Sequence, residues 1–336
     1  MASKITPLRV GVIGLGWFGE VHCDAIIGIP ELILSALSTR NAERLKDLAT
    51  KYQVSKAKTD FMDVVNDPDI DIIVVTTAWD KHKDATIAAL KAGKHVFLEK
   101  PITSTISDGE ELIKTSKNCE GIFFVGHICR FNPRYQAAQR AVASGELGQI
   151  ISIKTHRNLP APMTEKFINQ TGPITSDAIH DIDLILWLTG DSAGEVFTQT
   201  RSVRDFKNPD IAQLLLKLSS GVLASLEVNW HMPASTPYEV DEYLKVVGTL
   251  GSVEVGSGLN SLNLSTNQGF RNPDSTYWPM HNGVRRGALR DEYLQFISDI
   301  KNGKNSEFGR PDAALLALRV ALAAESSALQ GKVVKF

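Results

Sequence analysis

The feature that most constrains this fold is a glycine-rich loop set between an apolar strand and a helix. Residues 8–13 have the pattern of a short buried strand and run directly into GLGWFG at residues 14–19, after which a helical pattern follows. In this context Gly14 allows a tight turn, Gly16 lets a pyrophosphate approach the backbone, and Gly19 lets the helix pack on the strand. Unpaired N–H groups at the helix amino terminus favour an anion. The loop predicts a dinucleotide site, and a glycine-rich turn without a ligand is the alternative.

Strands and helices alternate along the first part of the chain. Apolar, β-branched runs at residues 32–37, 70–75, 95–98 and 122–125 are separated by helical patterns. Short strands that alternate with helices of this length are typical of a parallel, doubly wound sheet. We therefore predict an α/β protein with an NAD(P)-binding Rossmann domain over residues 1–127.

The pattern changes in the second part of the chain. Strands are predicted at residues 214–218, 222–230 and 244–247, with turn sequences between them. Consecutive strands joined by tight turns favour an antiparallel sheet. Residues 128–336 are expected to form a second α/β domain, whose last helix can pack within it or back on the first domain.

Composition excludes several classes of partner. The chain has 336 residues, enough for two domains, and a net charge of −2, which gives no reason to expect nucleic acid or a membrane surface. Its three cysteines have no metal-ligand spacing, and an odd number fits a reducing compartment. The first residues lack the pattern of a signal peptide. We expect a cytoplasmic protein without a metal centre.

A lysine follows the predicted strand at residues 95–98, within the tripeptide Glu99-Lys100-Pro101. The carboxyl ends of parallel strands form the edge at which open α/β sheets bind ligands. A lysine is costly to hold there unless its charge is used, so Lys100 is a candidate for chemistry. The alternative is a solvated surface lysine.

Three motifs in order carry a family resemblance: GLGWFG at residues 14–19, AGKHVFLEKP at 92–101 and HDID at 180–183. With these, and VVGTLGS at 246–252, the chain resembles the Gfo/Idh/MocA family of oxidoreductases. The resemblance implies a carboxy-terminal domain with an open, mainly antiparallel sheet, which binds the substrate and often mediates dimers or tetramers. It also implies nicotinamide-dependent oxidation or reduction of a sugar, a cyclitol such as inositol, or a similar polyol.

The resemblance implies roles for two residues. Lys100 would be catalytic, with a peptide before Pro101 that is often cis in the family, and His180 would be the acid/base. Oxidation of an alcohol needs a base for the hydroxyl proton, and histidine, with an ordinary pKa of about 6.5, suits this task. We interpret Lys100 as the group that holds and polarises the substrate oxygen. Asp183 could orient the His180 ring, and a histidine that is merely hydrogen-bonded is the alternative reading.

The chain departs from the family pattern just before this histidine. Family members commonly have an aspartate four residues before it, where this chain has Ser176, and the nearest carboxylate is Asp177. Either Asp177 substitutes as a catalytic residue, or His180 and Lys100 act without it. Ser176 and Asp177 are also suited to cap a helix.

The residues after the second strand bear on the choice of cofactor. An NAD site usually has an acidic residue about 20 positions past the last glycine, and counting from Gly19 reaches Thr39. Ser38, Thr39 and Arg40 could instead bind the 2′-phosphate of NADP. We therefore predict NADP in preference to NAD, although Arg40 could also face solvent.

The other predicted cofactor contacts lie in loops that follow strands, where each could also be an ordinary loop residue. They are Trp17, Phe18, Thr76, Thr77, Trp79, His82, Glu99 and Lys100.

Four residues are candidates for substrate contacts. Arg130 lies where the chain crosses between the domains, although a structural role is an alternative. Arg157 could bind an acidic or phosphorylated substrate. Trp230 and Tyr277 could stack on a sugar ring, or lie at dimer contacts.

Other functions remain open at this point. The runs RFNP at residues 130–133 and HDID at 180–183 resemble nucleotide-sugar 3-dehydrogenases, so a nucleotide sugar is a possible substrate. An NAD-dependent glycoside hydrolase and a non-catalytic nucleotide sensor are further alternatives. A sensor needs no acid/base pair, so Lys100 and His180 argue against it.

Overall fold

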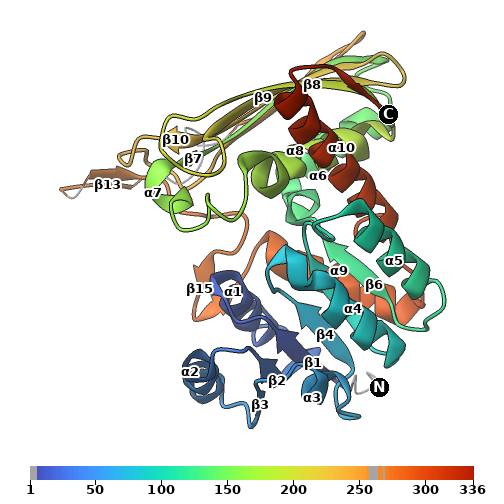
Figure 1. The fold of residues 1–336 in the computed structure, drawn as a ribbon, viewed down its shortest axis with the longest axis vertical. Coiled ribbons are helices and arrows are strands. Elements are labelled where there is room, and N and C mark those ends of the chain that lie inside the picture. Colours follow the sequence, from blue (N-terminus) through green and yellow to red (C-terminus); the bar gives the residue numbers. More distant parts are fainter. Residues whose placement is uncertain (1–5, 257–263, 268) are drawn as a thin grey trace. The chain divides into compact units, whose positions relative to one another are not determined.

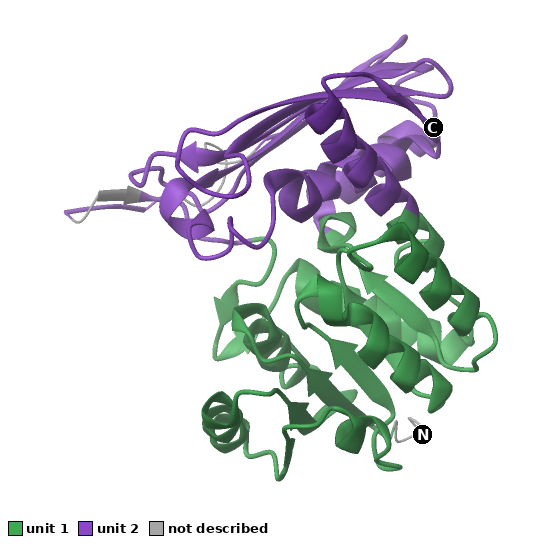
Figure 2. Cartoon of the chain, in the orientation of Figure 1, with its two compact units in different colours: residues 1–131, 276–315 green, residues 132–275, 316–336 purple. Residues whose placement is uncertain are grey.

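The structure is a computed structural model that describes residues 6–256, 264–267 and 269–336. The chain divides into two compact units, each made of two segments (Figure 2). Unit 1 contains residues 1–131 and 276–315, and unit 2 contains residues 132–275 and 316–336. The division therefore differs from a single boundary at residue 127, because a late segment of the chain packs with the first.

Unit 1 contains a parallel sheet of six strands in the order β3-β2-β1-β4-β5-β6 (Figure 1). The strand order reverses between β1 and β4, and such a switch point is where doubly wound sheets bind ligands. The predicted Rossmann domain is confirmed. The strands are β1 (Leu8–Ile13), β2 (Leu32–Ser38), β3 (Lys56–Lys58), β4 (Ile72–Val75), β5 (His95–Glu99) and β6 (Phe123–Gly126).

The centre of this sheet is buried on both faces. Every residue of β4 is at most 1% exposed, because the β-branched run IIVV has apolar side chains on both sides of the strand. Helix α1 packs with α9, and α4 packs with α5. The helices and short elements of unit 1 are α1 (Trp17–Ile26), α2 (Ala42–Tyr52), α3 (Met62–Val65), η1 (Trp79–Lys81), α4 (His82–Lys91), α5 (Ile106–Ser116), η2 (Ile128–Phe131), β15 (Met280–His281), β16 (Val284–Arg285) and α9 (Ala288–Asn302).

Unit 2 contains a seven-stranded sheet in the order β12-β11-β7-β10-β9-β8-β17. Strands β7 and β10 are parallel and the other neighbouring pairs are antiparallel, which confirms a mainly antiparallel sheet. Its strands are β7 (Ile150–Pro160), β8 (Ala193–Arg201), β9 (Ile211–Leu218), β10 (Leu223–Met232), β11 (Asp241–Gly248), β12 (Ser252–Gly256) and β17 (Val334–Lys335). A two-stranded ribbon joins β13 (Leu264–Thr266) and β14 (Gly269–Arg271).

One face of this sheet is covered by helices and the other is open (Figure 1). Strand β9 alternates buried and exposed residues along most of its length, as expected for a sheet with one face against a core. The covering elements are α6 (Pro133–Ala143), α8 (Ile179–Thr189) and α10 (Pro311–Gln330), the last divided between the units after Leu315. Two short elements, α7 (Ala161–Thr164) and η3 (Ile174–Ala178), complete the unit.

Candidate active site

Two glycines of the loop are required by backbone packing. Gly14 has a φ of +96°, and a Cβ there would lie 2.6 Å from the Thr77 nitrogen. A Cβ at Gly19 would lie 2.1 Å from the Gly14 carbonyl oxygen. The Thr76 hydroxyl donates to that same oxygen at 2.6 Å. The loop is therefore held against the end of β4 by contacts that exclude any side chain at these two positions.

Gly16 is different, because space lies beside it. A Cβ at Gly16 would meet no atom of the described chain within 4 Å, and its φ of −68° is ordinary. Gly16 is the N-cap of α1, so the first N–H groups of the helix face this space. The Thr77 hydroxyl nearby is buried and has no hydrogen-bond partner within the described residues. The loop therefore fits a dinucleotide, with the pyrophosphate against the helix amino terminus.

Aromatic side chains surround the start of α1. Trp17 is 67% exposed, and its ring meets Trp278 edge-on at 5.9 Å between centroids. Phe18 contacts Trp278 and also His22. Tyr277, a predicted substrate contact, is half-buried, with its hydroxyl 3.7 Å from the Cys129 sulfur. The segment of Tyr277 and Trp278 belongs to unit 1, whereas the sequence interpretation put it in the second domain.

The end of β2 carries the residues that bear on NAD or NADP. Ser38 is buried, Thr39 is half-buried and Arg40 is exposed. Asn41 caps α2 by accepting the Arg44 N–H. Arg44 donates from Nε to the Leu15 carbonyl at 3.2 Å and pairs with Glu20, so it braces the glycine loop.

Lys100 follows directly after β5, at the same sheet edge as the glycine loop. Its peptide bond to Pro101 is cis, as the family resemblance implies. The Lys100 side chain is half-exposed, and its backbone N–H donates to Glu99 Oε2 at 3.1 Å. Glu99 is only 7% exposed, and its other oxygen lies 3.1 Å from His22 Nε2. The Glu99 carboxylate is thus engaged inside unit 1, and a cofactor contact by this residue stays a prediction.

His82 needs a correction. It is 1% exposed, with Nδ1 at 2.9 Å from the Pro101 carbonyl and Nε2 at 3.0 Å from the Thr77 carbonyl. Burial lowers the pKa of this imidazole, which favours the neutral ring. His82 therefore connects the loops after β4 and β5 and does not present its ring to a ligand. Trp79, in η1, is half-buried and stays a predicted contact.

In unit 2, the element before His180 is irregular. His180 is the second residue of α8 and is 8% exposed. The π-helix η3, which carries Ser176 and Asp177, comes immediately before it. Such π segments are frequent at functional sites. Asp183, which was expected to orient the ring, is 1% exposed.

Trp230 is not a stacking surface. It is fully buried in unit 2, and its indole N–H donates to Asp177 Oδ2 at 2.8 Å. The predicted substrate contact is therefore replaced by a role in fixing Asp177.

Arg157 is not available to an acidic substrate. It is 4% exposed and pairs with Asp181 at 2.9 Å and with Glu242 at 3.3 Å. Burial raises the pKa of Asp181, while the Arg157 charge opposes that rise. Arg157 could turn toward a ligand only by breaking both buried ion pairs, which is costly, so its guanidinium has an internal role in place of the predicted substrate contact.

Arg130 has the structural role that was the alternative for it. It is 3% exposed and donates to the carbonyls of Glu307 and Phe308, all within unit 1.

Three residues of unit 1 were missed by sequence reasoning: Arg44, His22 and Tyr293. Arg44 lies outside any motif, so no signal in the sequence pointed to it. A polar residue on the apolar face of a predicted helix was the available signal for His22. Among the described residues, no group of three metal-binding side chains occurs, and no helix there is long and apolar enough to cross a bilayer.

Comparison with known proteins identifies the family. Residues 8–127 match the model of the oxidoreductase family with an NAD-binding Rossmann fold, and residues 135–254 match the GFO/IDH/MocA C-terminal domain. The chain belongs to the Gfo/Idh/MocA family. It is a nicotinamide-dependent oxidoreductase that acts on CH–OH groups.

Similar proteins match most of the chain. Myo-inositol 2-dehydrogenase of Thermotoga maritima is 29% identical over 98% of both sequences. The scyllo-inositol 2-dehydrogenase (NAD(+)) of Bacillus subtilis is 30% identical over 74% of both. The crystal structure of myo-inositol 2-dehydrogenase from Lactobacillus plantarum is 28% identical, with a TM-score of 0.86, over 98% of this chain and 100% of that one.

Alanine should have different effects at two positions of the glycine loop, on cofactor binding at Gly16 and on stability at Gly19. Gly16→Ala should leave the melting temperature unchanged. It should weaken the binding of NADH and of NADPH about tenfold or more, which is ~1.4 kcal/mol of binding free energy, because the methyl group enters the space expected for the pyrophosphate. Gly19→Ala should destabilise unit 1 by about 1–3 kcal/mol, because its Cβ collides with backbone. Calorimetry and cofactor titration measure both.

Gly256→Ala is the matched control, since a Cβ at this strand end likewise meets no atom of the described residues within 4 Å. It should change neither quantity. Unaltered cofactor affinity in Gly16→Ala would contradict the assignment of this loop.

Proposed function

We propose that the chain transfers hydride between a nicotinamide and a secondary carbon of inositol or a related cyclitol. The observation that carries the proposal is Lys100 at the end of β5, on the sheet edge that also holds the glycine loop. The similarity to myo-inositol 2-dehydrogenase over 98% of both sequences supports the substrate class. A sugar or nucleotide sugar is the second candidate, favoured by the RFNP and HDID runs.

The proposed mechanism divides the work between two side chains. The nicotinamide, when bound, supplies the hydride acceptor. The Lys100 ammonium holds the substrate oxygen and stabilises the negative charge that develops on it. His180 accepts the hydroxyl proton during oxidation and returns it during reduction. Asp177, fixed by the Trp230 indole, is proposed to assist His180.

A panel of myo-inositol, scyllo-inositol, sugars and nucleotide sugars, assayed for NADH and NADPH formation, tests the substrate class. Lys100→Met and His180→Ala should each lower kcat by about 10²–10⁴-fold on the best substrate, because each removes a group that acts on the reacting oxygen. Cofactor affinity should change little. Lys114→Met and His281→Ala, both at exposed positions, are matched controls.

The alternatives give different results in the same panel. Retention of NAD through purification, with sugar release and no net NADH, would indicate a glycoside hydrolase. Cofactor binding without turnover of any compound would indicate a sensor. Near-normal kcat in either variant would contradict the mechanism.

We propose NADP as the preferred cofactor, with NAD as the alternative. The support is a half-buried Thr39 and an exposed Arg40 where an NAD site usually has a carboxylate. The name of the Bacillus subtilis relative, with its NAD(+), points the other way.

Arg40→Ala should weaken the binding of NADPH at least about tenfold more than the binding of NADH. The reason is that it removes the cation that lies closest in the sequence to the expected site of the 2′-phosphate. Lys46→Ala, an exposed cation on α2, should affect neither. Titration of both cofactors measures the difference. Equal losses for NADH and NADPH would remove the argument for NADP.

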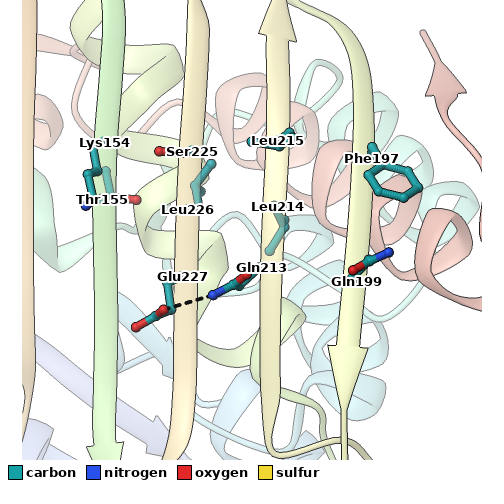
Figure 3. A pocket seen from close by; sticks show the side chains of 10 residues that line it. All are labelled: Lys154, Thr155, Phe197, Gln199, Gln213, Leu214, Leu215, Ser225, Leu226 and Glu227. Carbon is teal, nitrogen blue, oxygen red and sulfur yellow. Dashed lines mark hydrogen bonds between the residues drawn. The ribbon is translucent and has the colours of Figure 1, made fainter.

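We propose that the open face of the unit 2 sheet binds a second copy of the chain, as a dimer or as part of a tetramer. Leu215 and Leu223 on this face are 62% and 59% exposed. Leu215 lines a pocket with Lys154, in which Gln213 donates to Glu227 at 3.1 Å (Figure 3). Leu223 lines a second pocket, which Leu215 and Lys154 also line. Exposed apolar side chains rimmed by polar ones are typical of an interface.

The double substitution Leu215→Glu/Leu223→Glu should convert the oligomer into monomers, because it places like charges in the contact. Light scattering measures the mass. Leu329→Glu, at an 89% exposed position on α10, is the control and should leave the mass unchanged. A monomeric native protein at micromolar concentration would overturn the proposal.

A cytoplasmic location stays a prediction. Cys23, Cys119 and Cys129 are all free thiols, which fits a reducing compartment.

A further inference from the structure

A chain of buried polar contacts leads to the backbone of Lys100. The Tyr293 hydroxyl lies 2.6 Å from His22 Nδ1, and His22 Nε2 lies 3.1 Å from Glu99 Oε1. The other Glu99 oxygen accepts the Lys100 backbone N–H at 3.1 Å. Tyr293 and His22 are fully buried and Glu99 is 7% exposed. The contacts run from α9 through α1 to the end of β5, within unit 1.

One arrangement of protons satisfies these contacts. With the His22 proton on Nε2, the ring donates to the Glu99 carboxylate and accepts from the Tyr293 hydroxyl at Nδ1. Burial raises the pKa of Tyr293 well above its ordinary value, so the phenol keeps the proton that it donates. Glu99 then accepts one hydrogen bond on each oxygen, from the imidazole and from the Lys100 peptide.

The His22 ring is held by aromatic packing. Phe18 meets it edge-on at 4.8 Å between centroids, and Phe97 lies at 5.6 Å. Phe97 in turn stacks on the Tyr293 ring at 4.8 Å. Rotation of the imidazole would leave buried polar atoms unpaired, which is costly, so the ring and the Glu99 carboxylate share one stable geometry.

We propose that Tyr293, His22 and Glu99 are positioning residues that fix the Lys100 peptide and so direct its amine to the substrate oxygen. The inference rests on the proposed role of Lys100. A carboxylate that loses its His22 partner must find another donor, and the peptide it holds moves with it. Small misplacements of a catalytic group lower the rate steeply, since a shift of about 1 Å can reduce it about a hundredfold.

Two substitutions at His22 separate positioning from bulk. In His22→Gln the amide nitrogen can replace Nε2 as a donor to Glu99, whereas His22→Met fills similar space without a donor. Hydrogen exchange of the peptide that contains Lys100, followed by mass spectrometry without substrate, should accelerate at least about tenfold in His22→Met. It should stay within about threefold of the native rate in His22→Gln.

The kinetic measurement uses myo-inositol and the preferred cofactor, or the best substrate of the panel. His22→Met should lower kcat about tenfold to a hundredfold, measured well below the melting temperature of each variant, while cofactor affinity changes little, and His22→Gln should restore most of the kcat. Tyr293→Phe should lower kcat by a smaller factor. Tyr52→Phe is its control, because it removes a hydroxyl that donates to Asp24 at 2.7 Å elsewhere in unit 1.

Equal kcat losses in His22→Met and His22→Gln would overturn the inference. Native kcat in both His22 variants would also overturn it. Lys100→Met, measured in parallel, keeps the two proposals apart. If Lys100→Met is active, the proposed function fails; if it is inactive while His22→Met is native-like, only the positioning network fails.

Discussion

The first unit depends on the close approach of Gly19 to the carbonyl of Gly14. No side chain fits between them, and the Thr76 hydroxyl donates to the same oxygen. This contact fixes the start of α1 against the ends of β1 and β4. The open space beside Gly16 and the buried position of His22 both follow from where the helix begins. Cofactor site and positioning network are therefore set by one piece of backbone packing.

The late segment at residues 276–315 completes this unit. It supplies Trp278 beside the glycine loop and Tyr293 at the end of the buried polar chain. It also supplies the carbonyls that hold Arg130. The unit that carries the glycine loop is thus built from two segments far apart in the sequence, and the Lys100 edge of the sheet is supported by residues almost 200 positions later in the chain.

Sequence reasoning worked where a short local pattern determines the position of a residue in the fold. Glycines between a strand and a helix, and a lysine after a buried strand, place Gly14, Gly16 and Lys100 without tertiary information. It failed where the role of a side chain depends on which other residues contact it. Trp230 and Arg157 are residue types that bind sugars and phosphates when exposed, but here Asp177 and two buried carboxylates use them internally.

The same limit applies to His82 and to the boundary between the two domains. A histidine in a loop after a strand has no local signal to show that carbonyls will enclose it. Nor does a helix near the end of a chain show which sheet it will pack against. Both outcomes depend on contacts between distant segments.

Strand β10 has a further consequence for how this chain can vary. Its even-numbered residues from Ala224 to Trp230 face the core, where Trp230 donates to Asp177, while Leu223, Ser225 and Glu227 face outward. Substitutions on the outer side change the face proposed to bind a second copy but leave the packing of the inner side in place. A one-residue insertion or deletion would exchange the two faces along the strand, burying the charge and exposing the indole. Length in this strand is therefore far more constrained than composition.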